Sequence, residues 1–349
     1  MRDALDRRPR ALKAAAALGA ALALALSVSA SAMRGSAAAW SGRADAAARS
    51  ERADADAAAK RNAAAIRALT QPFTIAALPD TQFYSADHSP YFRRQVHWVL
   101  THAASRHIAF VTQLGDVVDD SFISSQWATA QQALGPLLRR DTLPFSIVRG
   151  NHDYATLFLQ NFPVWRMREK RWFVGSSPSG LAQAQTFLVQ KARFLHIGFE
   201  YAPSAEELAW ANALLRRPAL KGMPVVVSTH DYMVYGARDS TGESIWNGFV
   251  KKNRMVFMVL CGHVHLESAI VSRDAAGQPV YQMLSDYQSR PNGGDGLMRL
   301  IRIDPARGRI QVRTFSPYYD GAPANHYETD RDSQFAYTLN VRARLTWRP

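Results

Sequence analysis

The sequence contains a single cysteine, Cys261, in 349 residues. One cysteine forms no disulfide within the chain, and it excludes a structural zinc site built from several thiolates. Because Cys261 ends an apolar run, we interpret it as a small buried hydrophobic residue.

The sequence also lacks a block of Lys and Arg interleaved with aromatic residues. Its 42 Lys and Arg against 29 Asp and Glu give a net charge of +13, and a basic surface attracts nucleic acids, anionic membranes or phosphorylated molecules. Without such a block we expect no specific nucleic-acid partner. The charge therefore favours anionic substrates without choosing one, and it leaves the oligomeric state open.

Charged residues are absent from residues 14–32, an alanine-dominated apolar stretch near the start. A basic segment (7–13) precedes this stretch, which ends in the small-x-small sequence Ala30-Ser31-Ala32. The pattern predicts a cleaved signal peptide, with an uncleaved membrane anchor as the alternative. We therefore expect an exported protein, periplasmic or secreted by the Sec or twin-arginine route, with no stable membrane insertion after cleavage.

Large apolar side chains are scarce over residues 33–71, which are rich in Ala, Arg and Asp. We interpret this segment as a solvated linker that is intermittently helical. From Phe73 onward the pattern changes to apolar strands, loops and helices. The predicted organisation is a signal peptide (1–32), a linker (33–71), a main domain (72–317) and a C-terminal extension of that domain (318–349).

The main domain alternates short apolar runs with segments of helical periodicity. Strands that alternate with helices indicate an α/β fold, and the later hairpins indicate mixed sheets. The five strands that matter for the site are predicted at 72–78, 107–114, 143–148, 223–229 and 255–261.

Polar residues cluster directly after each of these five strands. A single cluster of this kind is usually a turn or a helix cap, but five in order are hard to assign to chance. In open α/β sheets, ligands bind at this end of the strands. The clustered residues are Asp80 and Gln82, then Asp116 and Asp119, then Asn151, His152 and Asp153, then His230, and finally His263 and His265.

Two histidines follow the last of these strands at a spacing of two, in the sequence Gly262-His263-Val264-His265. Residues i and i+2 of an extended chain point to the same side, so the two imidazoles could aim at one point. The alternative is a pair of partly buried loop histidines.

The residue types of the clusters fit a pair of metal ions. A carboxylate can bridge two cations, and imidazole and amide oxygen complete the shells without adding negative charge. Gly115, Gly150 and Gly262 would let the backbone turn sharply where metal and substrate approach. The clusters therefore predict a metal centre at the strand ends.

The ordered motifs D-x-Q, GDVVD, GNHD, TH and GHVH over residues 73–265 resemble the calcineurin-like metallophosphoesterase family. Residues 285–303 and 314–317 also resemble the closing strands of bacterial exported members that carry a D-T-Q first motif. The resemblance implies a four-layer α-β-β-α sandwich in which two mixed sheets are flanked by helices. It also implies hydrolysis of a phosphorylated small molecule with two divalent or trivalent ions, Mn, Fe, Zn or Mg.

The resemblance assigns the metal ligands by motif. It implies a bridging role for Asp116, a first metal held by Asp80 and His265 with Gln82 nearby, and a second metal held by Asn151, His230 and His263. The usual first motif is D-x-H, so Gln82 is a departure. Gln82 either ligates the first metal through its amide oxygen or only hydrogen-bonds a water on it. We hypothesise a dinuclear centre with a labile first metal.

The resemblance also implies the reaction, which is in-line attack of a metal-bound hydroxide on phosphorus. His152 would be the general acid that protonates the leaving alkoxide, and Asp119 would orient its imidazole. The alternatives are a non-catalytic binding protein on the same scaffold, or an extracellular nuclease or phosphodiesterase. Monoesters and diesters are not distinguished.

Weaker candidates come from positions beside the motifs. We expect substrate contacts from Tyr154, Tyr232, Tyr287 and Arg290, with ordinary packing as the alternative. Asp153 is expected to stabilise the turn after His152, and Asp231 to support His230 from behind.

Overall fold

The computed structural model describes residues 45–319 and 327–347. The chain divides into two compact units, residues 1–55 and 56–349. The described part of the first unit, residues 45–55, is helical. The predicted signal peptide lies outside the described residues, and within those residues no helix is long and apolar enough to cross a membrane.

The first sheet of the second unit is mixed. Three parallel strands form one side of it, and antiparallel strands form the other side. Its order is β15 (Tyr327–Glu328), β14 (Arg309–Phe315), β13 (Met298–Asp304), β1 (Phe73–Leu78), β2 (Ile108–Gln113) and β3 (Phe145–Ile147), with β16 (Gln334–Thr338) also paired to β14.

The second sheet has four parallel strands at its centre and antiparallel strands at both edges. Its order is β11 (Glu267–Arg273), β12 (Pro279–Ser285), β10 (Val256–Cys261), β7 (Val225–Ser228), β6 (Ala192–Gly198), β5 (Gln183–Val189) and β4 (Phe173–Ser176). β8 (Met233–Val234) and β9 (Ala237–Arg238) form a separate two-stranded sheet, and Arg238 donates to Ser272 and Gln282 of the second sheet.

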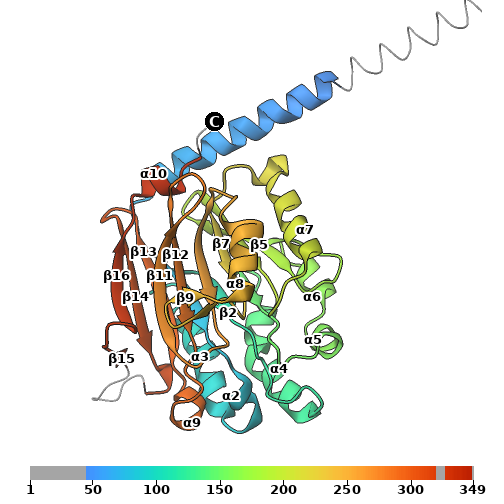
Figure 1. The fold of residues 1–349 in the computed structure, drawn as a ribbon, viewed down its shortest axis with the longest axis vertical. Helices are drawn as coiled ribbons and strands as arrows, with labels where there is room; N and C mark the ends of the chain where they lie inside the picture. Colours follow the sequence, from blue (N-terminus) through green and yellow to red (C-terminus); the bar gives the residue numbers. More distant parts are fainter. Residues whose placement is uncertain (1–44, 320–326, 348–349) are drawn as a thin grey trace, which may run out of the picture. The chain divides into compact units, whose positions relative to one another are not determined.

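Helices lie on the outer sides of the two sheets (Figure 1). The side of the first sheet carries α2 (Gln82–Ala86), α3 (Ser89–His102), α4 (Ser124–Arg139), α5 (Ala155–Asn161) and α6 (Val164–Arg168). The side of the second carries α7 (Ala205–Leu215), α8 (Ser240–Ile245) and a π-helical turn (Trp246–Val250). The short helices α9 (Pro291–Gly294) and α10 (Val341–Leu345) follow later in the chain.

Three apolar clusters separate these layers. The first lies between the sheets, where Phe73 of β1 meets Phe194 of β6 with ring centroids 5.2 Å apart. The second packs α3 and α4 against the first sheet, and the third packs α7 and α8 against the second. Strands covered on both faces read as unbroken apolar runs, as β1 and β10 do. The predicted four-layer sandwich is confirmed.

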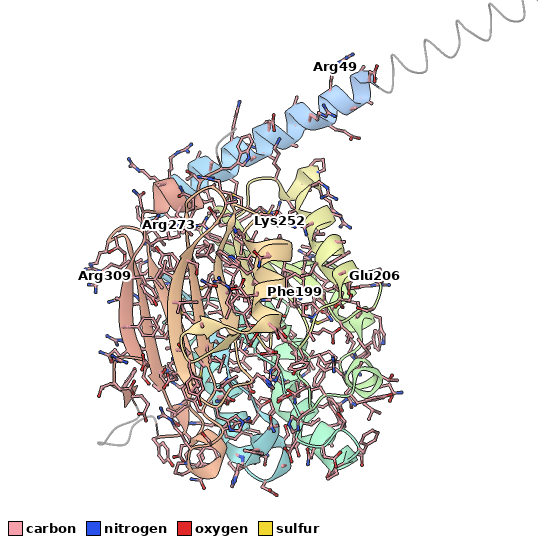
Figure 2. The ribbon with its side chains drawn as sticks, in the orientation of Figure 1. Arg49, Phe199, Glu206, Lys252, Arg273 and Arg309 are labelled. Atoms are coloured by element: carbon pink, nitrogen blue, oxygen red, sulfur yellow. The ribbon has the colours of Figure 1, made fainter. Side chains whose placement is uncertain are left out.

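Side chains sort by polarity across these layers. Charged residues such as Glu206, Lys252 and Arg273 project from the surface, whereas Phe199 is fully buried (Figure 2). Ser204 caps α7, since its hydroxyl accepts from the Glu207 amide at 3.2 Å and the Glu207 carboxylate accepts from the Ser204 amide at 3.0 Å. This reciprocal pair is a capping box, which fixes where the helix begins.

Part of the segment expected to be a solvated linker is packed. Residues 56–67 are helical, and the spacing of Ala59, Ala63 and Ile66 places them on one buried face. Ile66 and Leu69 belong to the cluster between the sheets. Alanine has no long side chain, so the alanine face can dock closely, and Ile66 and Leu69 anchor its C-terminal end in the core.

Candidate metal centre

The predicted site residues gather at the carboxyl ends of the parallel strands. Asp80, Asp116 and Asn151 follow β1, β2 and β3 of the first sheet, and His230 and His263 follow β7 and β10 of the second. The carboxyl ends of parallel strands share one edge of a sheet. Both sheets therefore contribute donors to one site.

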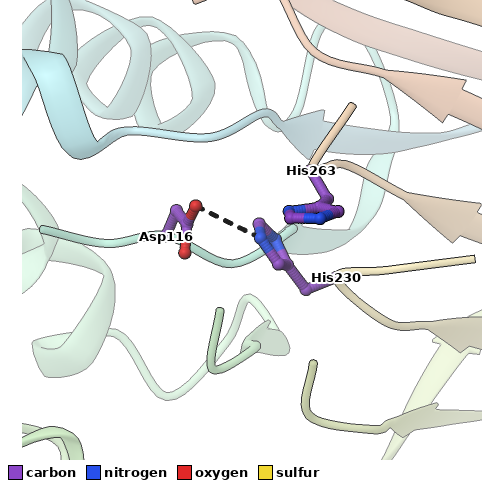
Figure 3. Close-up of side chains that lie close together, drawn as sticks. All are labelled: Asp116, His230 and His263. Carbon is purple, nitrogen blue, oxygen red and sulfur yellow. Dashed lines mark ion pairs between the residues drawn. The ribbon is translucent and has the colours of Figure 1, made fainter. Parts of the chain in front are cut away.

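Three of these side chains form a compact cluster. The donor atoms of Asp116, His230 and His263 lie within 4.8 Å of one another (Figure 3). Asp116 Oδ2 is 3.2 Å from His230 Nε2, and the two imidazole centroids are 4.9 Å apart. These donors lie far apart in the sequence and converge only through the fold.

His230 shows why this cluster suits a cation. Its Nδ1 lies 2.9 Å from the Leu114 carbonyl oxygen, which can only accept, so Nδ1 carries the proton. In the neutral ring Nε2 then offers a lone pair, and it faces Asn151 Oδ1 at 3.0 Å and Asp116 Oδ2. Three electron-pair donors that face one another need a positive charge between them.

Without a cation, that positive charge falls on His230 itself. Burial lowers the pKa of His230, but the carboxylates of Asp80 and Asp116 outweigh the burial and raise it to about 10. The electrostatic environment of the site therefore favours a bound cation or a protonated His230.

The D-x-Q motif contributes two further donors. Asp80 Oδ2 accepts from the His263 amide at 3.0 Å, and Gln82 Nε2 donates to Asp119 Oδ1 at 3.0 Å. The remaining oxygens, Asp80 Oδ1 and Gln82 Oε1, are buried and have no hydrogen-bond partner among the described residues. A buried oxygen without a partner is costly, and a cation would satisfy both. The residues present therefore fit a metal centre.

Two of the predicted glycines make room for the carboxylates. A Cβ at Gly150 would lie 2.0 Å from Asp116 Oδ1, and a Cβ at Gly262 would lie 2.0 Å from Asp80 Oδ1. Neither distance is physically possible. Space, rather than the expected sharp turn, is thus the reason for glycine at these two positions, whereas Gly115 has a positive φ of +107°.

His152 lies at the half-exposed side of the centre. Its Nδ1 is 2.6 Å from the main-chain carbonyl of Asp119 and 3.7 Å from the Asp119 carboxylate. The carbonyl accepts, so Nδ1 is protonated and Nε2 is the atom free to exchange a proton. Asp119 thus positions the ring through its backbone, while its carboxylate positions Gln82.

His265 and Asn151 are exposed, and His265 Nε2 contacts Gln288 Nε2. The centre is therefore buried at Asp80, Gln82, Asp116 and His230, and it opens towards solvent at Asn151, His152 and His265. Such a gradient allows substrate to reach one side of a held cation.

Asp153 and Asp231 are the two residues expected to support the centre. Asp153 is buried and accepts from the amides of Gly150, Val117 and Val118 at 2.9–3.1 Å, so it joins the loops after β2 and β3. Burial and the Asp116 charge raise its pKa to about 6. His230 Nδ1 contacts the Leu114 carbonyl at 2.9 Å, so support of His230 by Asp231 would be electrostatic rather than a hydrogen bond at this nitrogen, and it stays a prediction.

The four weaker substrate candidates differ in exposure and in their contacts within the protein. Tyr154 is 56% exposed and its ring lies 5.7 Å from that of Phe122. Tyr232 and Tyr287 are fully buried, and their hydroxyls donate to Gln282 and Glu267, as expected for the alternative of ordinary packing.

Arg290 is also engaged within the protein. Its guanidinium pairs with Glu267 at 3.0 Å and with Glu328 at 3.1 Å. Two carboxylates already offset the positive charge of Arg290, so it is a weak candidate for substrate contact.

Three residues beside the centre were not predicted from the sequence. Asp286 and Gln288 follow β12 and are buried, and the charge of Asp286 adds to burial in raising the pKa of Asp80. Asp286 and Gln288 could have been predicted, because they are polar residues that follow an apolar strand, as in the five clusters. Phe122 is 79% exposed, and its sequence context gave no such signal.

Comparison with known proteins identifies one family. A family model described as calcineurin-like phosphoesterase matches residues 73–267. The uncharacterized protein YvnB of Bacillus subtilis (strain 168) is 29% identical over 289 residues, which is 78% of this chain and 22% of the relative. The chain therefore spans about a fifth of the length of this curated relative.

Two solved structures share the fold. A dimetal phosphatase from Danio rerio aligns with a TM-score of 0.52 at 13% identity, covering 76% of this chain and 99% of that chain. The purple acid phosphatase PPD1 from yellow lupin (Lupinus luteus) seeds aligns with a TM-score of 0.51 at 11% identity, covering 79% and 55%. At these identities the likeness concerns the fold alone.

Proposed function

The chain belongs to the calcineurin-like phosphoesterase family, and we propose that it is a hydrolase that cleaves phosphoesters with the help of bound divalent cations. One observation carries this proposal. Donors from both sheets, Asp116, His230 and His263, converge within 4.8 Å of one another at the carboxyl ends of the strands. Within the family, this is the place where a phosphoester hydrolase needs them.

We assign the cations to two overlapping groups of donors that share Asp116. The first group consists of Asp80, Gln82, Asp116 and His265, and the second consists of Asp116, Asn151, His230 and His263. When bound, such a pair of cations lowers the pKa of water and neutralises charge on the phosphoryl group. The unpartnered oxygen of Gln82 is available either to a cation or to a water bound to one.

His152 is the proposed general acid. Its Nδ1 proton is held by the Asp119 carbonyl, so the doubly protonated ring would deliver its Nε2 proton to the leaving oxygen as the phosphorus–oxygen bond breaks, and would be left neutral with its proton on Nδ1. The half-exposed imidazole of His152 can reach substrate, and its contact with the Asp119 carbonyl fixes the orientation of the ring. Asp119 would thus act as a positioning residue for both His152 and Gln82.

Tyr154 and Phe122 are the proposed contacts for the leaving group. Ser121 Oγ donates to the His152 carbonyl and accepts from the Tyr154 amide, both at 2.6 Å, so the loops that carry the acid and the aromatic pair are joined. Exposed aromatic rings that are held in place favour flat or apolar groups. We propose that esters of aromatic alcohols are better substrates than esters of small aliphatic ones.

Export is proposed from the pattern of residues 1–32 alone. A phosphorylated small molecule outside the cytoplasm would then be the natural substrate. The mass of the protein recovered from the periplasm or medium tests this, because cleavage after Ala32 removes a defined segment. A full-length mass in the cytoplasmic fraction would contradict it.

The direct test is hydrolysis by purified protein. We expect turnover of an aryl phosphate ester with Mn²⁺, Zn²⁺, Fe²⁺ or Mg²⁺, and loss of turnover after chelation. Asp116→Asn should lower kcat at least a hundredfold, while the exposed His97→Ala control should match the wild type. A protein that binds cations but cleaves neither monoesters nor diesters would instead be a binding protein on the same scaffold.

A further inference from the structure

A second D-x-Q sequence, Asp286-Tyr287-Gln288, repeats the pattern of Asp80-Thr81-Gln82 at the same edge of the fold. Asp286 comes directly after β12, as Asp80 comes shortly after β1. The family match ends at residue 267, so it assigns no role to this second pair.

The strand register places the second pair beside the two histidines of the centre. Strands β10 and β12 are parallel neighbours, and Cys261 pairs with Leu284. His263 and Asp286 each come two residues after this pair, and His265 and Gln288 each come four residues after it. The contact between His265 Nε2 and Gln288 Nε2 shows that this correspondence continues past the strands.

Most of the unpartnered buried atoms among the described residues belong to the two D-x-Q pairs. In the part of the chain that the structure describes, seven buried side-chain atoms lack a hydrogen-bond partner. Four of them are one oxygen from each member of the two D-x-Q pairs: Asp80 Oδ1, Gln82 Oε1, Asp286 Oδ2 and Gln288 Oε1. Two buried carboxylates and two buried amides at one edge thus each keep one oxygen free.

The other contacts of the second pair hold it in position. Asp286 Oδ1 accepts from the main-chain N–H of Gln288 at 3.0 Å, and the main-chain N–H of Asp286 donates to the Leu266 carbonyl at 3.1 Å. One oxygen of Asp286 is therefore used to fix the loop, and the other is left over. This division matches Asp80, whose Oδ2 is bonded and whose Oδ1 is not.

We propose that Asp286 and Gln288 are cation-binding residues of the metal centre, which makes its first site rich in oxygen. The proposal rests on the cation centre of the proposed function, though not on hydrolysis. Gln82 supplies an oxygen where an imidazole would supply nitrogen, and Asp286 and Gln288 add two more. Carboxylate and amide oxygens suit hard cations such as Mn²⁺ and Mg²⁺, whereas imidazole-rich sites suit Zn²⁺.

Calorimetric titration of the full, chelator-treated protein with MnCl₂ and with ZnSO₄ tests this assignment. We expect Asp286→Asn to weaken one Mn²⁺ site ten- to a hundredfold and to weaken Zn²⁺ binding less. Gln288→Ala should weaken the same site and serves as a second variant. Asp274→Asn is the matched control, because Asp274 is also buried with an unpartnered oxygen but lies at the opposite end of β12.

A purely structural role for Asp286 predicts a different result. Removing a negative charge from a buried group of carboxylates should keep or raise the melting temperature of the metal-free protein, whereas loss of a structural residue would lower it. Mn²⁺ affinity within twofold of wild type in both variants would overturn the proposal. If wild-type protein binds Mn²⁺ but cleaves no phosphoester, the proposed function fails and the ligand assignment stands; if it binds neither cation, both fail.

Discussion

At the scale of single residues, His152 has the most specific role. We expect His152→Ala to lower kcat about 10²–10⁴-fold on an alkyl phosphate ester, because a poor leaving group needs a proton. On an activated aryl ester the loss should be only about tenfold, below the range typical of a general acid, because an activated leaving group departs with little need of a proton. Initial rates on the two esters measure the difference.

A matched His97→Ala variant controls for the loss of a histidine in general, and metal content shows that the centre is intact. Equal losses on both esters would show that His152 positions substrate rather than delivering a proton. Unchanged rates on both would remove it from the reaction.

His196 gives a residue-scale prediction about stability. It is fully buried between Gln185 and Ser228, each at 2.9 Å, and burial lowers its pKa to about 3. The unfolded chain takes up a proton near pH 6.5 and the folded chain does not, so stability falls as pH drops from about 6.5 towards 3. Between pH 6.5 and 5 the loss from this residue should be about 2 kcal/mol.

Urea unfolding of wild type and His196→Gln, both metal-free, at pH 7 and pH 5 isolates this contribution. The same carboxylates and histidines of the centre titrate in both proteins, so they cancel in the difference. If the free energy of unfolding depends on pH identically in the two proteins, buried His196 makes no pH-dependent contribution to stability.

At the scale of elements, Glu267 connects the two sheets. It lies in β11 of the second sheet and pairs with buried Arg299 in β13 of the first, and Thr314 of β14 donates to it at 2.9 Å. Removing one partner leaves a buried unpaired charge. Glu267→Gln should lower the free energy of unfolding by about 3–5 kcal/mol.

Denaturant unfolding measures this change. The exposed Glu169→Gln is the control, and it should stay within about 0.5 kcal/mol of wild type. A loss as small as that of the control would mean that water reaches Arg299 and replaces the carboxylate.

The loops after β2 and β3 are joined by Ser121, which bonds the His152 carbonyl and the Tyr154 amide. The exposed rings of Phe122 and Tyr154 lie beside this junction. We expect Phe122→Ala to lower kcat/KM about tenfold for an aryl ester and to leave an alkyl ester nearly unchanged, since only the flat group gains ring contact. Steady-state kinetics on both esters measure the ratio. The exposed Tyr235→Ala is the control, and parallel losses on both substrates would reject the aromatic contact.

At the scale of the whole molecule, the centre draws donors from both sheets, so cation binding should stabilise the sandwich. A ligand at a hundred times its Kd adds about 2.7 kcal/mol of stability. In a protein of this size that raises the melting temperature by on the order of 5 °C. Melting curves with Mn²⁺ and with chelator measure the shift, and Asp116→Ala should abolish most of it. Equal melting temperatures with and without Mn²⁺ would show that no cation links the sheets.

Local patterns predicted the strands, the mixed sheets and most of the donors, whereas the four-layer arrangement was implied by the family resemblance. Buried parallel strands read as apolar runs, and donors such as Asp116 and His263 directly follow them. Properties that depend on tertiary contacts were not predictable. Tyr232 and Phe122 are both aromatic residues beside motifs, yet one is buried and the other is exposed.

The helix over residues 56–67 illustrates the same limit. Its alanines carry little hydrophobic signal, and their burial depends on the surface that receives them. Asp286 and His263 occupy corresponding positions after β12 and β10. This correspondence depends on the register of the two strands, which neither strand's sequence shows by itself.

The close approach of Gly150 to Asp116, and of Gly262 to Asp80, has a consequence for engineering. Any other amino acid at either position would place a carbon atom where a carboxylate oxygen lies. A redesign that seeks a new substrate must therefore leave these two positions untouched and vary the outer loops instead.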